Sequence, residues 1–365
     1  MKAYAVLEGA TEISEITLPT PVPVGSEVVL RVLHSGVCHS DTHLLEGGYD
    51  LGARGMMLLK DRGVPYPLVL GHEVVGTVER VGPQASPELV GKTLLVFPWI
   101  GCGECSTCRA GHDNACTDGR MLGVQRQGGY AEYISVPHEK YLVDISGLDP
   151  AWAATLACSG LTSYSAVNKV RQLDPDDAVV IIGAGGLGLT AIAMLNARGH
   201  RHTIAVDLSE PNLKLAMEMG ATATVPADSP TLSAAIVETA GGPVAAVIDF
   251  VNGTSTAIHG FDALRKGGLL VHVGLFGGEL TIPTVLLPVK MLTLQGSYVG
   301  NLTELRELVD LAKAGALPHI PIIDGRLDAT GVADSLARLV ERRVAGRIVL
   351  SAVQAPDSGE LTART

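Results

Sequence analysis

Aromatic and basic residues are both scarce in this chain, and each scarcity argues against a class of protein. Only 4% of the 365 residues are aromatic while 43 are glycine, which favours a turn-rich α/β protein over an all-β sandwich. Lysine and arginine number 27 against 38 aspartate and glutamate, and the net charge of -11 argues against a nucleic-acid surface. We therefore expect small-molecule partners and no nucleic acid.

Two kinds of apolar segment are also missing. The N-terminus lacks the charged start and apolar core of a secretory signal, so we expect a cytoplasmic protein whose cysteines bind metal rather than form disulfides. Residues 178–197 are uncharged and mostly apolar, but their clustered glycines are typical of a buried strand, a tight turn and a helix. We therefore expect no membrane span.

The pattern of apolar residues changes along the chain and predicts an α/β protein of two domains. Residues 1–151 contain short strands separated by Gly and Pro, which predicts a β-rich domain. Residues 152–295 alternate strands and helices, beginning with a strand at 179–182 and a helix at 187–198, which predicts a parallel sheet. We expect residues 296–365 to rejoin the first domain and to end in a flexible tail from about residue 354.

Four of the six cysteines have the close spacing of a closed metal site within a lobe at about residues 98–118. They are Cys102, Cys105, Cys108 and Cys116. Four thiolates at about 2.3 Å fill the tetrahedral shell of one zinc ion, so we interpret this site as structural zinc. An iron–sulfur cluster or two disulfides are the alternatives. The bacterial ferredoxin pattern ends in Cys-Pro with a different last spacing, whereas Thr117 follows the last cysteine here.

The remaining two cysteines, Cys38 and Cys158, lie far apart, beside turns rich in Gly, Ser or His. A lone buried cysteine is usually just a small hydrophobic residue, and spacing alone does not unite these two. With His72 they would form the Cys/His/Cys set with an open fourth position that is typical of catalytic zinc. Such an ion lowers the pKa of a bound water, or of a bound alcohol, towards about 7.

A glycine-rich hexamer between a predicted strand and helix indicates a dinucleotide site. It comprises Gly183, Ala184, Gly185, Gly186, Leu187 and Gly188. Such a turn lets the backbone approach a pyrophosphate at the helix N-terminus. Asp207 ends the next strand, where it would bind ribose hydroxyls and repel a 2′-phosphate, so we expect NAD rather than NADP. A turn without a ligand, or one that binds FAD, is the alternative.

Taken together, these motifs resemble those of the zinc-dependent medium-chain alcohol dehydrogenases, and most of all the tetrameric NAD-linked enzymes of archaea and bacteria. The resemblance covers about residues 1–350 and includes Gly-Val-Cys-His-Ser-Asp at 36, Leu-Gly-His-Glu at 70 and Cys-Ser-Gly-Leu-Thr at 158. It implies a Rossmann doubly wound parallel sheet inserted into a β-rich GroES-like catalytic domain. It also implies two zinc ions per chain and reversible hydride transfer between NAD and a primary or secondary alcohol, giving an aldehyde or ketone.

The resemblance also implies roles for residues around the catalytic metal. Cys38, His72 and Cys158 would hold the zinc ion. Glu73 is similar to a carboxylate that can enter the metal shell, and Asp41 is similar to the partner that orients His72.

Four further residues match proton-transfer and cofactor positions of the family. Ser40 and His43 match a relay in which the substrate proton passes to Ser40, through the nicotinamide ribose, and on to His43. His39 and Arg347 match cationic contacts to the dinucleotide phosphates.

The positions that match the family's substrate pocket are mainly apolar, which suits an alkyl or aryl alcohol better than a polyol. They are Trp99, Met121, Leu275 and Tyr298. Ordinary core packing is the alternative for each. A zinc-dependent polyol dehydrogenase is the alternative function, but it usually lacks a ligand like Cys158. A non-enzymatic zinc module would explain the cysteine cluster without explaining the glycine turn.

Two segments suggest contacts beyond a single domain. The loop at residues 47–65 is longer than in the commonest alcohol dehydrogenases, and its run Met56-Met57-Leu58-Leu59 favours a roof over the substrate channel or a subunit contact. The apolar, strand-rich stretch at residues 279–295 suits a sheet-edge interface. We therefore expect a homotetramer or homodimer.

Overall fold

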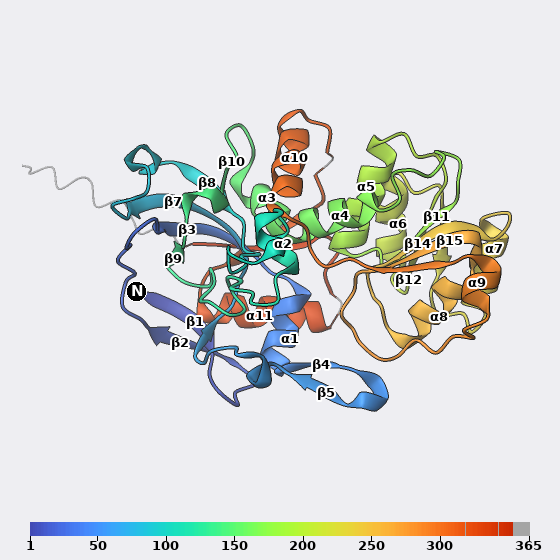
Figure 1. The fold of residues 1–365 in the computed structure, drawn as a ribbon, viewed down its shortest axis with the longest axis horizontal. Helices are drawn as coiled ribbons and strands as arrows, with labels where there is room; N and C mark the ends of the chain where they lie inside the picture. The colour runs from blue at the N-terminus through green and yellow to red at the C-terminus, as the bar shows by residue number, and fades with distance from the viewer. Residues whose placement is uncertain (318, 342, 353–365) are drawn as a thin grey trace, which may run out of the picture.

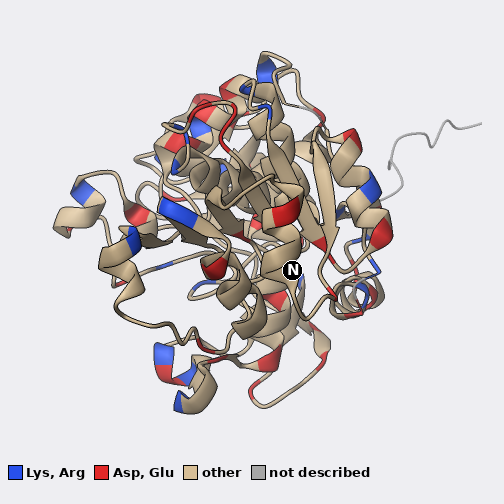
Figure 2. Cartoon of the chain, turned by 90° about the vertical axis from the view of Figure 1, so that its right-hand side faces the viewer, with Lys and Arg blue, Asp and Glu red and all other residues tan. Residues whose placement is uncertain are grey.

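Two domains lie side by side in the computed structural model, which describes residues 1–317, 319–341 and 343–352 (Figure 1). The predicted tail from about residue 354 lies outside the described residues. No helix in these described ranges is long and apolar enough to cross a membrane. Figure 2 shows basic and acidic residues interspersed along the ribbon.

The first domain is built mainly from strands, in agreement with the punctuated apolar pattern. Within the described residues, one sheet has the order β2-β1-β6 and a larger one the order β10-β8-β7-β3-β18-β17, with β9 also paired to β3. The strands are β1 (Lys2–Val6), β2 (Ile13–Thr17), β3 (Val28–Gly36), β6 (Leu68–Val69), β7 (Glu73–Val81), β8 (Thr93–Val96), β9 (Tyr133–Val136), β10 (Leu142–Asp144), β17 (Ile322–Arg326) and β18 (Arg347–Ser351).

The two ends of the chain meet in the larger sheet. Strand β18, near the end of the described chain, pairs antiparallel with β3, where Val349 lies opposite Gly36. Among the described residues, the α-helices that accompany the strands of this domain are α1 (His39–Glu46), α2 (Ser106–Arg109), α3 (Pro150–Thr155) and α11 (Ala329–Val340). Helix α3 begins at Pro150, because Asp149 caps it and proline suits a first helical turn. It therefore extends across the expected domain boundary at residues 151 and 152, and it packs on β3, β7 and β18.

The second domain is a parallel sheet with the order β13-β12-β11-β14-β15-β16. Its strands are β11 (Val179–Ile182), β12 (Thr203–Asp207), β13 (Ala223–Pro226), β14 (Val244–Asp249), β15 (Leu264–His272) and β16 (Thr293–Gly296). Its helices are α5 (Gly186–Ala197), α6 (Glu210–Glu218), α7 (Leu232–Thr239), α8 (Thr254–Asp262) and α9 (Leu286–Lys290). The strand order reverses between β11 and β14, and ligands of such sheets bind beside this reversal.

Helices α4 (Leu161–Asn168) and α10 (Leu302–Lys313) lie between the two domains in Figure 1 and pack on each other. A π-helical turn, Leu156–Gly160, connects α3 to α4. Such turns are rare and occur often at functional sites.

The stretch at residues 279–295 is not strand-rich, so that expectation was wrong. It contains α9, and only its last three residues belong to β16. Pro283 and Pro288 lack the N–H group that a strand ladder requires, which explains the interruption. One edge of the sheet is formed by β16, in which this stretch ends, and the other by β13.

The long loop at residues 47–65 forms a hairpin of β4 (Gly48–Asp50) and β5 (Met56–Leu58). Its apolar run is only partly buried, since Met56 is 53% exposed and Leu58 37%, whereas Leu59 is 4% exposed. The hairpin reaches the second domain, where Gly278 N–H donates to Asp50 O at 3.3 Å.

Replacing Ile181 should reveal how far the second domain depends on its central strand. Ile181 in β11 is fully buried. We expect Ile181→Ala to lower the free energy of unfolding by about 2–5 kcal/mol, because it leaves a cavity between packed layers. Urea unfolding followed by circular dichroism measures the change. Val22→Ala at an exposed position is the control, and equal midpoints for the two variants would contradict this account.

Candidate functional site

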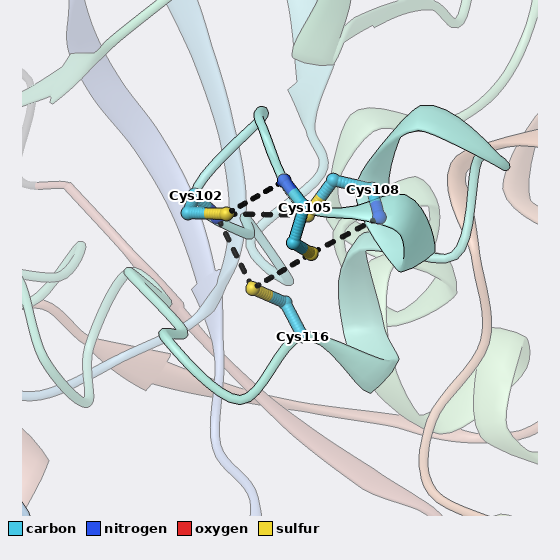
Figure 3. Close-up of side chains that lie close together, drawn as sticks. All are labelled: Cys102, Cys105, Cys108 and Cys116. Atoms are coloured by element: carbon cyan, nitrogen blue, oxygen red, sulfur yellow. Dashed lines mark hydrogen bonds between the residues drawn. The ribbon is translucent and has the colours of Figure 1, made fainter.

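The cysteine cluster has the geometry of a closed zinc site (Figure 3). The Sγ atoms of Cys102 and Cys108 are 3.9 Å apart, and those of Cys105 and Cys116 are 3.8 Å apart. Two thiolates on one tetrahedral zinc at about 2.3 Å lie about 3.8 Å from each other. A disulfide would require about 2.05 Å, and all six cysteines of the chain are free. The donor set therefore fits zinc.

Backbone groups of the lobe stabilise thiolates. Cys105 N–H donates to Cys102 Sγ at 3.3 Å, and Cys108 N–H donates to Cys105 Sγ at 3.4 Å. The Glu104 N–H, at 3.4 Å, and the Cys105 N–H lower the pKa of Cys102, and the Cys108 N–H helps to bring the pKa of Cys105 to about 6. Burial raises the pKa of Cys108, a cost that the charge of a bound cation would offset.

The structure brings together Cys38, His72 and Cys158, the three residues that the family resemblance assigns to the catalytic zinc. Their ligand atoms all lie within 4.8 Å of one another, and the three residues are buried. Cys38 and Cys158 have sulfur atoms 3.9 Å apart, which again matches a shared tetrahedral zinc. Within the described residues this group holds three ligands, so zinc bound there would keep a fourth position open.

Three separate elements bring these ligands together. Cys38 is the N-cap of α1, directly after β3. His72 immediately precedes β7, and Cys158 lies in the π-helical turn between α3 and α4. The site therefore depends on the assembled first domain and not on one local motif.

The buried carboxylate of Asp41 organises this site. It accepts the N–H of Cys38 at 3.0 Å, the N–H of Gly71 at 3.2 Å and the hydroxyl of Tyr130 at 3.0 Å. His72 Nδ1 lies 3.4 Å from Asp41 Oδ1, close enough for electrostatic attraction although it is not aligned as a hydrogen bond. The sequence offered no signal for Tyr130, which comes from a distant loop.

The surroundings of His72 favour a positive charge. Burial acts to lower the pKa of His72, but the Asp41 carboxylate and the Cys38 sulfur outweigh it and hold the pKa well above its usual value. The same anionic groups would attract a metal cation. Neither ring nitrogen has a hydrogen-bond partner among the described residues. A metal ion at this site would displace the proton from one of them, because only the neutral imidazole coordinates.

Glu73 and Arg347 were assigned separate roles from the sequence, yet they form one buried ion pair. Arg347 Nη2 donates to Glu73 Oε2 at 2.6 Å, and Ser159 N–H donates to Glu73 Oε1 at 3.0 Å. Burial raises the pKa of Glu73, and Arg347 opposes that rise. Glu73 is not a member of the three-ligand group in this arrangement.

The glycine turn faces a cavity of about 430 Å³ that extends to the metal ligands. Gly185 has open space where a side chain would begin, whereas a Cβ on Gly188 would lie 1.9 Å from Gly183 O. Asp207 Oδ2 accepts the N–H of Ala184 at 2.7 Å, which ties the end of β12 to the turn. The predicted cofactor residues that line this cavity are His39, Gly183, Gly185, Gly186, Leu187, Gly188, Asp207 and Arg347.

The same lining also includes most of the predicted relay and pocket residues: Ser40, His43, Trp99, Leu275 and Tyr298. Met121 is not in the lining. Its sulfur instead accepts the hydroxyl of Tyr298 at 3.5 Å, so it supports the wall from behind. Tyr49 of β4 is a lining residue that the sequence reasoning missed, and its ring centroid lies 5.3 Å from that of His43. An aromatic residue in an unusually long loop was the available signal.

Comparisons with known proteins agree with this geometry. Residues 25–147 match the alcohol dehydrogenase GroES-like domain, and residues 186–314 match the zinc-binding dehydrogenase family. An NAD-dependent alcohol dehydrogenase of Sulfurisphaera tokodaii is 36% identical over 96% of this chain and 99% of its own length.

Solved structures show the same similarity. The alcohol dehydrogenase of Aeropyrum pernix has a TM-score of 0.86 at 32% identity, covering 96% of this chain and 100% of that one. The acetophenone reductase of Geotrichum candidum, solved in complex with NAD, has a TM-score of 0.83 at 28% identity, covering 96% of both chains.

Fold and site together define an oxidoreductase that joins a dinucleotide cleft to a metal-ligand group. The chain belongs to the zinc-dependent medium-chain alcohol dehydrogenase family, and its activity is that of an NAD-dependent alcohol dehydrogenase.

Removing the Asp41 carboxylate should weaken metal binding at one site only. Asp41→Ala deletes the group beside His72, so we expect zinc affinity at the three-ligand site to fall about 10- to 100-fold. Metal analysis after dialysis against a chelator would then show loss of the ion from this site, with the cysteine-cluster ion retained. Glu46→Ala, on the same helix but exposed, is the control. Unchanged zinc retention in Asp41→Ala would refute the role of this carboxylate.

Proposed function

We propose that this enzyme reversibly oxidises primary and secondary alcohols with alkyl or aryl groups, using NAD and two zinc ions per chain. The observation that carries the proposal is a single cavity whose lining includes both Cys38 and Cys158 and the glycine-turn residue Gly185. This arrangement would bring an alcohol at the open ligand position next to the nicotinamide end of the cofactor. The cysteine cluster would bind the second zinc ion as a purely structural element.

Zinc bound at the three-ligand site would act as a Lewis acid on the alcohol oxygen. NAD bound in the cleft would accept the hydride from the carbinol carbon. Ser40 and His43 lie three residues apart in α1, so their side chains share one face of the helix and both line the cavity. In this proposal Ser40 takes the hydroxyl proton and His43 passes it outward. Glu46 Oε2, 3.5 Å from His43 Nδ1, lies on the solvent side of that route.

The ion pair of Glu73 and Arg347 supports the proposed roles of both residues. Arg347 also lines the cavity beside Gly186, where its guanidinium would contact a dinucleotide phosphate together with His39. Glu73 lies next to His72 in the chain and would approach the metal only by giving up its bond to Arg347.

The apolar character of the substrate end supports alkyl and aryl alcohols over polyols. Trp99 donates its indole N–H to Ala157 O at 2.9 Å, so it presents carbon rather than a hydrogen-bonding group to the cavity. Leu275 and Phe276 line the same cavity, and burial raises the pKa of Tyr49 to about 12, which keeps its hydroxyl neutral. A polyol would find few partners for its hydroxyls here.

Metal content and substrate range together test this proposal. We expect two zinc ions per chain, and NAD-linked oxidation of ethanol, 2-alkanols and benzylic alcohols measured by NADH absorbance. Cys38→Ser should retain one zinc ion and lose turnover, because the open site loses a thiolate ligand. Full activity of Cys38→Ser, or activity confined to sorbitol and other polyols, would overturn the assignment.

We also propose that the protein is cytoplasmic, because its six cysteines are free. We propose that it forms a homodimer or homotetramer, because the sheet ends at an open edge. Strand β16 forms that edge, and Val285, Val289 and Met291 beside it are more than half exposed. Apolar side chains next to an unpaired strand favour association with a second copy.

A charge at this edge should disrupt assembly. Because Val289→Asp would bury a carboxylate in the interface, we expect it to lower the mass measured by analytical ultracentrifugation to that of a smaller assembly. Val24→Asp, at another exposed valine, serves as the control and should leave the mass unchanged. An unaltered oligomer in Val289→Asp would exclude this edge as the interface.

A further inference from the structure

The cysteine lobe makes direct contact with the wall of the cavity. Asn114 lies in a short 3-10 turn, Asp113–Ala115, immediately before the zinc-cluster residue Cys116. Its side-chain amide Nδ2 donates to the backbone oxygen of Tyr298 at 3.1 Å, across 184 positions of sequence. The closed metal site is thereby joined to a residue that lines the cavity.

The Tyr298 side chain is held by two residues, Trp99 at the start of the same lobe and Met121 just after its end. Its ring packs edge-on against Trp99, with ring centroids 6.0 Å apart. Its hydroxyl donates to Met121 Sδ at 3.5 Å. Tyr298 is nevertheless 48% exposed, and it lines the cavity. Its ring position therefore affects the width of the cavity at this end.

The backbone that follows Tyr298 is strained. Val299 has a φ of 44°, a left-handed conformation that is unfavourable for a β-branched residue, and it is 6% exposed and lines the cavity. The peptide between Tyr298 and Val299 is planar, so a bond that holds its carbonyl also sets the direction of its N–H group. Asn114 provides such a bond from the outer side.

We infer that Asn114 is a positioning residue for the substrate wall, through which the cysteine lobe sets the width of the pocket at Tyr298. This inference rests on the proposed place of Tyr298 in the substrate pocket. The lobe then contributes more than stability. It holds one side of the pocket by a directed hydrogen bond at the Tyr298 carbonyl, and a second polar contact, between Asn301 Nδ2 and His112 Nδ1 at 3.5 Å, lies beside it.

Two variants at Asn114 test the inference. Asn114→Ala removes the donor, and Asn114→Asp keeps the shape while placing a carboxylate against the carbonyl oxygen of Tyr298. With the wall released, small alcohols lose contacts while larger ones gain room. We expect KM for ethanol to rise about fivefold with kcat nearly unchanged, the size of effect typical of one neutral hydrogen bond, and KM for benzyl alcohol to stay within about twofold. Asn114→Asp should raise KM for ethanol further than Asn114→Ala, because its carboxylate would repel the carbonyl oxygen of Tyr298.

A binding measurement separates positioning from catalysis. Trifluoroethanol resists oxidation because its fluorines disfavour hydride loss, so calorimetry can follow its binding to the enzyme with NAD. We expect its Kd to rise about fivefold in Asn114→Ala, with zinc content and melting temperature unchanged. Glu104→Ala, at an exposed position in the same lobe, is the control and should match the wild type. Equal losses for all alcohols accompanied by zinc loss would show that Asn114 only stabilises the lobe.

A double-mutant cycle with Tyr298→Ala completes the test. If Asn114 acts through Tyr298, Asn114→Ala should change the ratio of ethanol to benzyl alcohol activity in the wild type but not in Tyr298→Ala. An additive effect would refute the inference. Tyr298→Ala that leaves the substrate range unaltered would instead refute the place of Tyr298 in the pocket, so the two failures are distinguishable.

Discussion

The buried ion pair between Glu73 and Arg347 joins segments that lie far apart in the chain. Glu73 begins β7, directly after His72 of the three-residue group, and Arg347 begins β18, which returns from the far end of the chain to pair with β3. The Arg347 side chain also packs against Gly186 in the cofactor turn. Removing one partner of such a pair typically costs about 3–5 kcal/mol, because it leaves an uncompensated buried charge. The pair therefore couples the larger sheet of the first domain to the glycine turn of the second domain.

The two metal-ligand groups follow from the same coordination chemistry but differ in how the chain builds them. The cluster of four cysteines draws on one short lobe whose own backbone N–H groups donate to the sulfurs. The three-ligand group is assembled from Cys38, His72 and Cys158 on separate elements, with Asp41 joining the first two. A closed site can be local because the ion itself orders the loop, whereas an open site must be held rigid by its surroundings.

Much of the fold was predictable because its signals are local. The apolar run at 179–182 is strand β11, and the helix predicted at 187–198 is α5, displaced by one residue at each end. The stretch at 279–295 is apolar enough for a strand, but Pro283 and Pro288 lack the N–H groups that a strand ladder needs. The partial exposure of Met56 and Leu58 could not be predicted, since burial depends on which surface the hairpin meets.

The sequence by itself determined the residue types of the chemistry: six thiols in two spacings, a glycine turn after a strand, and Asp207 at the end of the next strand. These signals are readable because metal coordination and close phosphate approach tolerate few alternatives. Only the tertiary structure decided that Glu73 pairs with Arg347, that Tyr130 bonds Asp41, that Met121 lies behind Tyr298 and that Tyr49 enters the cavity lining. Those contacts join segments far apart in the chain, so their partners are set by how the sheets and helices pack and leave no spacing in the sequence to reveal them.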